Sequence, residues 1–197
     1  FTPVMYAGFS YLTGYNSQRV LSTDGVIGGL TYGLVLHNTG QTGNGWNLLA
    51  KPFTASNYYN SATPEFATIG KVWNSEEGSF NELYPGAIIP PMSGFAVEVL
   101  ETTATFSFPS ESRTHAAGYL PEAPQPSIAL SVSETQNGTR QHAAININSL
   151  ATEVYDSQFD AGFLKGFAPQ LYSFAGTSRL SVNTLPSVTS GRLIRIG

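Results

Sequence analysis

The chain contains no cysteine, and this absence excludes several kinds of site at once. Without thiols it can form no disulfide, no thiolate metal site and no cysteine nucleophile. Charge is scarce too: charged residues make up 11% of the 197 residues, against about a quarter in ordinary globular domains. The net charge is −4 and no basic run occurs, so we expect no nucleic-acid partner. No apolar run approaches the length of a bilayer span, so we expect no membrane insertion.

Aromatic and uncharged polar residues take the place of the missing charges. The chain has 12 Phe, 10 Tyr and 20 Gly, a mixture that favours strands and turns over helices. A surface rich in Ser, Thr, Asn and Gly with few charges favours a secreted protein, so we expect an extracellular or cell-surface location. The first residue is Phe1 rather than methionine, which indicates a processed or excised chain.

Alternation of apolar and polar residues predicts a series of strands and no amphipathic helix. Near the middle of the first half, the alternation puts Trp46, Leu48 and Ala50 on the core face of a strand. Residues 30–37 also alternate, and the polar loop after them indicates a hairpin with the Trp46 strand. Asn137-Gly138 predicts a second hairpin, between residues 128–133 and 140–148. Further strands are predicted at residues 4–12, 66–73, 95–100, 103–108, 170–174, 179–185 and 192–196.

The predicted fold class is all-β, with two antiparallel β-sandwich units, immunoglobulin-like or jelly-roll-like, packed together or in series. The break falls in a linker at residues 117–126, which holds three prolines and little periodicity. Residues 1–116 form the first sandwich, and residues 127–197 form a second one that is short of strands. The residues expected in the two cores are Trp46, Leu48, Phe95, Val97, Phe106 and Phe108, and Ile145, Ile147, Leu171, Leu180, Val182 and Ile194.

Several short motifs follow one another in a recognisable order. Gly45-Trp46-Asn47-Leu48-Leu49 and Pro52-Phe53 are followed by the stretch IPPMSGFAV at residues 89–97 and by a strand that ends at Arg113. Residues 151–165 and 180–186 continue the series. In this order the motifs resemble modules of large bacterial surface proteins exported by the type IX secretion route. The resemblance implies β-sandwich modules, a surface location and no established catalytic residues.

This chain departs from the family pattern at two places. Lys51 stands where the family has Asn before the proline, and Tyr155 and Phe159 exchange the family's aromatic positions. The family's last strand also continues beyond the equivalent of Gly197, so on this comparison the second unit lacks its closing strands. Either the chain is truncated there, or an open sheet edge is left to pair with a neighbouring chain.

Catalytic patterns are weak, and we expect no enzyme activity. The three histidines are His37, His115 and His142, and no Gly-x-Ser-x-Gly elbow accompanies them. A glycosidase needs two carboxylates across a cleft, and the glutamates between residues 76 and 101 single out no such pair.

Two groups of residues are candidates for binding. Glu153, Asp156 and Asp160 lie in one irregular stretch, where carboxylates could hold a calcium ion. The alternative, which we favour, is that they cap turns or bond loop amides, with no cofactor bound. The loop residues Asn57, Tyr58, Tyr59 and Asn60 could form a platform for a glycan, or their rings could cover the end of the core.

Together these observations favour a non-catalytic extracellular structural module. Its partners would be other copies of the chain, assembling into a filament by strand pairing, or neighbouring domains of a larger bacterial surface protein. The alternative is a carbohydrate-binding or adhesive module that uses the loop at residues 57–60.

Overall fold

The computed structural model describes residues 31–40, 45–51, 53–60, 63–91, 93–116 and 128–197. Over these residues the chain consists of strands, turns and loops, with one 3-10 turn at Ser110–Ser112 (η1) and no α-helix. No helix in this part of the chain is long and apolar enough to span a membrane. The strand predicted at 4–12 and the linker predicted at 117–126 lie outside it. The all-β fold class is confirmed, while the two-sandwich arrangement stays a prediction.

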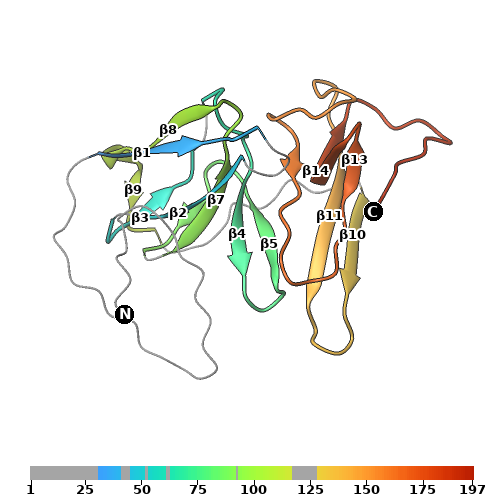
Figure 1. Cartoon of the computed structure of the whole chain (residues 1–197), viewed down its shortest axis with the longest axis horizontal. Coiled ribbons are helices and arrows are strands. Elements are labelled where there is room, and N and C mark those ends of the chain that lie inside the picture. Colours follow the sequence, from blue (N-terminus) through green and yellow to red (C-terminus); the bar gives the residue numbers. More distant parts are fainter. Residues whose placement is uncertain (1–30, 41–44, 52, 61–62, 92, 117–127) are drawn as a thin grey trace.

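The first part of the chain builds several antiparallel sheets (Figure 1). The largest has the strand order β2-β7-β4-β5. Its strands are β2 (Trp46–Ala50), β7 (Gly94–Glu98), β4 (Gly70–Asn74) and β5 (Ser79–Leu83). A second sheet pairs β1 (Tyr32–His37) with β8 (Thr103–Phe108). A third has β3 (Ser56–Tyr58) between β6 (Ile88–Ile89) and β9 (Arg113–Thr114).

One apolar core joins these sheets. Phe95, Val97, Phe106 and Phe108 are buried in it, as predicted. The prediction for β2 is wrong by one residue, because Leu49 is fully buried while Trp46 and Leu48 are only half-buried. A shift of one residue exchanges the faces of a strand. A Cβ built on Gly162 would lie 3.3 Å from Cζ2 of Trp46, so that ring turns toward the second part of the chain instead.

The predicted hairpin between residues 30–37 and the Trp46 strand is also wrong. β1 pairs along its whole length with β8, and β2 pairs with β7. Both pairings join segments that are distant in sequence, and local turn signals carry no information about them.

The second part of the chain, residues 128–197, forms one five-stranded sheet in the order β10-β11-β14-β12, with β13 also paired to β14. β10 (Ile128–Ser133) and β11 (Arg140–Ile147) form the hairpin predicted from Asn137-Gly138. Gly138 has φ of 71°, which glycine adopts without strain. The other strands are β12 (Ala161–Gly162), β13 (Ser173–Ala175) and β14 (Ser178–Leu185). β11 and β14 are parallel, and the remaining pairs are antiparallel.

Most of the predicted second core is found in this sheet. Ile145, Leu180 and Val182 are buried, and Leu171 and Ile194 are half-buried. Ile147 is 51% exposed, because it is the last residue of β11 and pairs with Leu185 at the end of β14.

The strand predicted at residues 192–196 is reduced to a single bridge between Ile196 and Ser173. Backbone hydrogen bonds still hold the tail along β13. Tyr172 and Gly197 exchange two of them, at 3.0 and 2.9 Å, and the N–H of Phe174 donates to the carbonyl of Arg195 at 3.1 Å. The described end of the chain therefore pairs within its own molecule.

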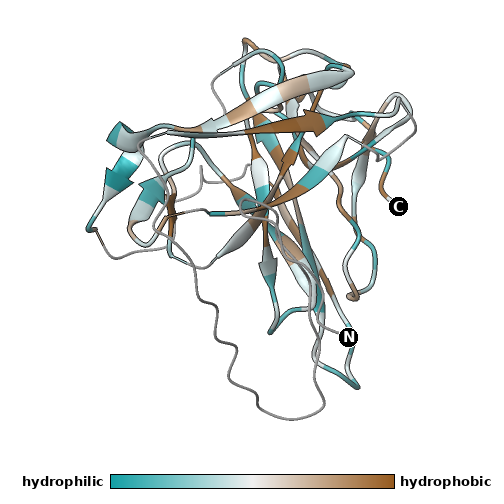
Figure 2. Cartoon of the chain, turned by 60° about the vertical axis from the view of Figure 1, so that its left-hand side comes forward, coloured by the Kyte–Doolittle hydropathy of each residue, from teal (hydrophilic) through white to brown (hydrophobic). Residues whose placement is uncertain are grey.

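The two parts lie side by side and are held together by apolar and polar contacts (Figure 1). Ile69 packs with Ala161 and Val182 in one buried cluster. The carbonyl of Gly78, in the β4–β5 turn, accepts hydrogen bonds from Phe167 and Ala168 at 2.7 and 2.9 Å. Figure 2 shows hydrophobic residues along strands in the interior of the molecule and hydrophilic residues at hairpin ends.

Candidate functional site

The free edge of the second sheet is the first candidate. β10 pairs only with β11 among the described strands, and it forms the outermost strand of that sheet in Figure 1. The pairing runs over six consecutive residues without a bulge. In an antiparallel edge strand, alternate residues point their N–H and C=O groups outward, so about half of the β10 residues present groups that no other described strand pairs with.

The side chains of β10 do not protect this edge. Natural sheets guard free edges with charges, prolines or bulges. The sequence of β10, IALSVS, contains no charge, no proline and no glycine. Ile128 is 43% exposed, and Leu130 and Val132 are half-buried on the same side. The strand therefore has the composition of an interior strand at an exposed position.

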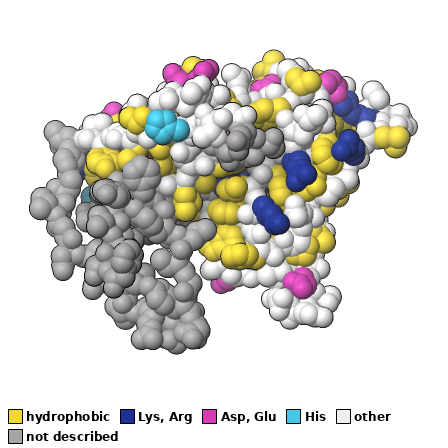
Figure 3. Space-filling view, in the orientation of Figure 1, with side chains coloured by type: hydrophobic (Ala, Val, Ile, Leu, Met, Phe, Trp, Pro, Cys, Tyr) yellow, Lys and Arg dark blue, Asp and Glu magenta, His cyan; other side chains and the backbone are white. Residues whose placement is uncertain are grey.

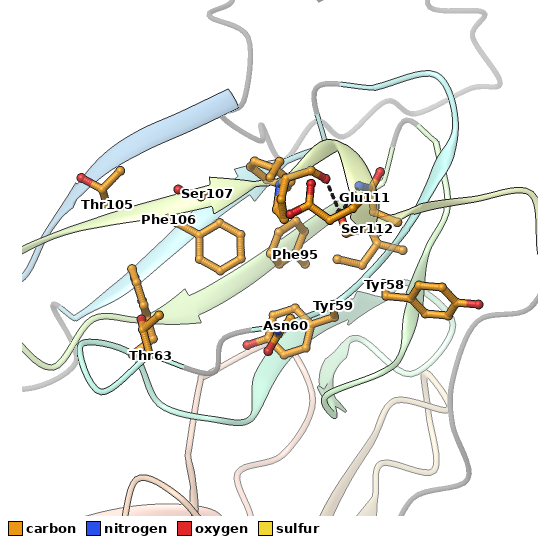
Figure 4. Close-up of a pocket in the computed structure, with 15 residues that line it drawn as sticks. Tyr58, Tyr59, Asn60, Thr63, Phe95, Thr105, Phe106, Ser107, Glu111 and Ser112 are labelled. Carbon is orange, nitrogen blue, oxygen red and sulfur yellow. Dashed lines mark hydrogen bonds between the residues drawn. The ribbon is translucent and has the colours of Figure 1, made fainter. Parts of the chain in front are cut away.

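The loop proposed for glycan binding lines a hollow of about 470 Å³ (Figure 4). Tyr58 is 46% exposed and points away from the hollow, whereas Tyr59 is 1% exposed and packs its ring 6.0 Å from Phe95. Neighbouring residues of an extended chain face opposite ways, so the two tyrosines do not form one platform. Asn57 is buried and donates from Nδ2 to Ser112 at 2.6 Å, while Asn60 is exposed.

Of the three acidic residues considered for calcium, Asp156 and Asp160 are bonded neighbours and Glu153 pairs elsewhere. Glu153 pairs with Arg192 at the surface. Asp160 is fully buried and accepts backbone N–H groups from Thr184 at 2.7 Å and from Asp156 at 2.8 Å. Within the described ranges, no group of three or more potential ligands is placed to hold a metal ion. Asp160 thus bonds one amide in β14 and one in the preceding loop, and the choice between a calcium site and a structural role stays a prediction.

A buried polar network connects the two parts of the chain, and the sequence analysis missed it. Lys71 is 1% exposed, donates to Glu82 at 2.8 Å and also contacts the hydroxyl of Ser181 in β14. Burial alone would raise the pKa of Glu82, but the Lys71 ammonium outweighs it and the pKa is lowered. Alternation does not reveal the burial of Lys71, because no local signal shows that a second sheet covers it.

Glu98 is the second member of this junction. Tyr155 donates to its carboxylate at 2.8 Å. Burial raises the pKa of Glu98, and burial together with the Glu98 charge raises the pKa of Tyr155. The hydrogen bond therefore joins the two parts of the chain at a buried position.

The histidines have ordinary partners. His142 lies 3.2 Å from Glu77, and His37 lies 3.3 Å from the hydroxyl of Thr103. Both contacts are at the surface, and His115 is exposed. None of these arrangements joins a nucleophile to a base and an orienting carboxylate.

Comparison of the chain with protein-family models, with curated proteins and with solved structures finds no match. The resemblance to modules of the type IX secretion route therefore depends on the sequence motifs alone.

Proposed function

We propose that this chain is a non-catalytic structural module of the cell surface or extracellular space, and that neighbouring chains join it by strand pairing at β10. The observation that carries the proposal is an exposed six-residue edge strand without any of the usual protecting residues. Main-chain hydrogen bonds to an added strand would satisfy the outward groups of β10 and extend the sheet. The low charge of the chain supports the location.

The form of the assembly depends on which segment of the neighbouring chain pairs with β10. If β10 accepts a different segment of the next chain, the contact is head-to-tail, and it builds a filament when the rotation between successive chains does not close a ring. The opposite edge of this sheet is a poorer acceptor, because β12 is only two residues long and the C-terminal residues pair with β13. We therefore assign β10 as the acceptor in the second sheet. Residues 4–12, predicted from sequence as an aromatic strand, are the candidate donor.

The test is the assembly state of the chain with a lysine placed on the edge. Ser131→Lys puts a charge on an exposed side chain in the middle of β10 and should leave the fold intact. We expect filaments by electron microscopy and a large mass by light scattering for the parent chain, and a monomer for the variant. Ser149→Lys, an exposed position outside the strands, is the matched control and should assemble like the parent. A parent chain that stays monomeric at high concentration would contradict the proposal.

A second candidate function is glycan binding at the hollow beside residues 57–60. It is favoured by the cavity of about 470 Å³, whose walls combine Tyr59 and Phe106 with the polar Asn60 and Thr105. Asn60→Ala changes an exposed wall residue and should lower glycan binding on an array without loss of stability. Tyr58→Ala removes the exposed ring that points away from the hollow, and unchanged binding in this variant together with lost binding in Asn60→Ala would place the ligand inside.

A further inference from the structure

Basic and aromatic side chains gather on the surface of the second sheet. Figure 3 shows the Lys and Arg side chains of the visible face grouped over this part of the molecule. The grouping is unexpected in a chain of net charge −4. We name it the basic strip, and it consists of Phe163, Lys165, Tyr172, Phe174, Arg179 and Arg195.

The aromatic rings of the basic strip form a row. The ring centroids of Phe163 and Tyr172 are 5.0 Å apart, and those of Tyr172 and Phe174 are 5.2 Å apart. Two guanidinium groups lie on this row. Cζ of Arg179 is 5.0 Å from the centroid of Tyr172, and Cζ of Arg195 is 3.8 Å from that of Phe174. Stacking on a ring fixes a guanidinium group while leaving its N–H donors at the edges free to bind an anion.

The backbone holds this row in place. The N–H of Phe163 donates to the carbonyl of Arg179 at 2.8 Å, and the C-terminal residues pair with β13 as described above. A Cβ on Gly197 would lie 2.7 Å from Cε2 of Tyr172, so the last residue packs closely on that ring. The cations are therefore presented by a preorganised surface rather than by mobile side chains.

The cations of the basic strip are not neutralised by acids of the described chain. Lys165, Arg179 and Arg195 are exposed, and none of them forms an ion pair there. Glu153, which lines a hollow together with Arg195, is already paired with Arg192. Two of these charges lie on the aromatic row and the third, Lys165, lines the adjoining cleft, all without an acidic partner among the described residues.

A cleft of about 690 Å³ opens beside the strip, between the two parts of the chain. Phe163, Lys165 and Arg179 line it together with Gln170 and Trp46. Glu98 also lines the cleft, and its carboxylate accepts a hydrogen bond from the hydroxyl of Tyr155. An aromatic wall with amide, hydroxyl and guanidinium groups is suited to sugar rings and their hydroxyls.

We infer that the basic strip and the adjoining cleft bind an acidic polysaccharide, one that carries a carboxylate or sulfate on successive sugars. A row of separated cations fits a polymer better than a single phosphate. Nucleic acid fits less well, because the faces of Tyr172 and Phe174 that would stack on bases are covered by Arg179 and Arg195. The inference does not depend on assembly through β10.

Affinity electrophoresis in gels that contain polygalacturonate tests the inference, with neutral dextran, polyglutamate and duplex DNA as the comparison polymers. We expect retardation by polygalacturonate that weakens with added salt, and none by dextran. Arg179→Gln and Arg195→Gln should each weaken binding about two- to fivefold, and together on the order of tenfold. Both residues are exposed, so the variants should fold, which circular dichroism verifies.

Arg140→Gln is the control for net charge, because it removes one exposed cation that belongs to neither the strip nor the cleft. It should change binding less than twofold. Unchanged binding in the Arg179→Gln, Arg195→Gln double variant would overturn the inference. Equal retardation by polyglutamate would show a response to charge alone, and stronger retardation by DNA would identify a nucleic-acid surface; either result would overturn it too.

Discussion

Lys51→Met should stabilise this protein. Lys51 follows β2, its side chain is 5% exposed, and its Nζ has no hydrogen-bond partner among the residues that the structure describes. Burial, followed by the charge of Arg113, lowers the pKa of Lys51 from 10.5 to about 8. A buried ammonium without an acceptor costs folding free energy, and methionine fills a similar volume without the charge.

The size of the stabilisation follows from the pKa of Lys51. Lowering this pKa from 10.5 to about 8 corresponds to roughly 3 kcal/mol, at about 1.36 kcal/mol for each step of one in pKa. Relaxation and water penetration screen part of this cost, so the expected gain at pH 7 is about 1–3 kcal/mol. For a chain of this length each kcal/mol raises Tm by about 2–4 °C.

The pH dependence separates this explanation from simple packing. Below pH 8 the amine is charged in both states, and the full cost is present. Between pH 8 and about 10.5 the unfolded chain holds a proton that the folded chain has released, so the stability of the parent rises with pH. Urea unfolding of parent and variant at pH 7 and pH 10 measures the difference. Loss of stability in the variant, or a gain that is the same at both pH values, would refute the reasoning.

Three further predictions concern buried or closely packed positions. Lys71→Met leaves the carboxylate of Glu82 without its cation and should lower the unfolding free energy by about 3–5 kcal/mol, whereas adding Glu82→Leu should restore most of it in urea unfolding. Burial raises the pKa of Asp160 to about 6, so the folded state keeps a proton that the unfolded state loses, and stability should fall as pH rises from about 4 to about 6. Asp160→Asn should remove that slope from the urea midpoints. Gly166→Ala would put a Cβ 2.5 Å from the Gly78 carbonyl oxygen and should cost about 1–3 kcal/mol in thermal unfolding.

Sequence reasoning succeeded where the signal was local. Asn137-Gly138 between two alternating segments was enough to predict the β10–β11 hairpin. Sequence reasoning failed where the burial of a residue depends on segments that are distant in the sequence. Trp46 was assigned to the first core because it heads an alternating strand, but the second part of the chain covers that face and Leu49 points inward instead. The burial of Lys51 and Lys71 has no local signal, because periodicity alone cannot reveal a buried charge.

The candidate sites were also hard to predict, because they depend on contacts between segments that are distant in the sequence. β10 could be predicted as a strand, yet only the sheet order shows that it is an edge. The basic strip escaped detection because its six residues are scattered over residues 163–195, and no motif joins them. Tyr58 and Tyr59 were grouped as neighbours in sequence, although adjacent residues on an extended chain face opposite ways.

The long separation between β1 and β8 has a consequence for the order of folding. Their paired residues His37 and Thr103 are 66 positions apart, so closing this sheet carries a large loop entropy before any contact compensates it. The β4–β5 and β10–β11 hairpins close over short turns and can form early. The β4–β5 turn also binds the second part through Gly78, so this hairpin can organise both parts while β1 is still unpaired. Until β1 docks, the edge of β8 that it pairs with is open, and that interval is when the protein is most prone to mispair.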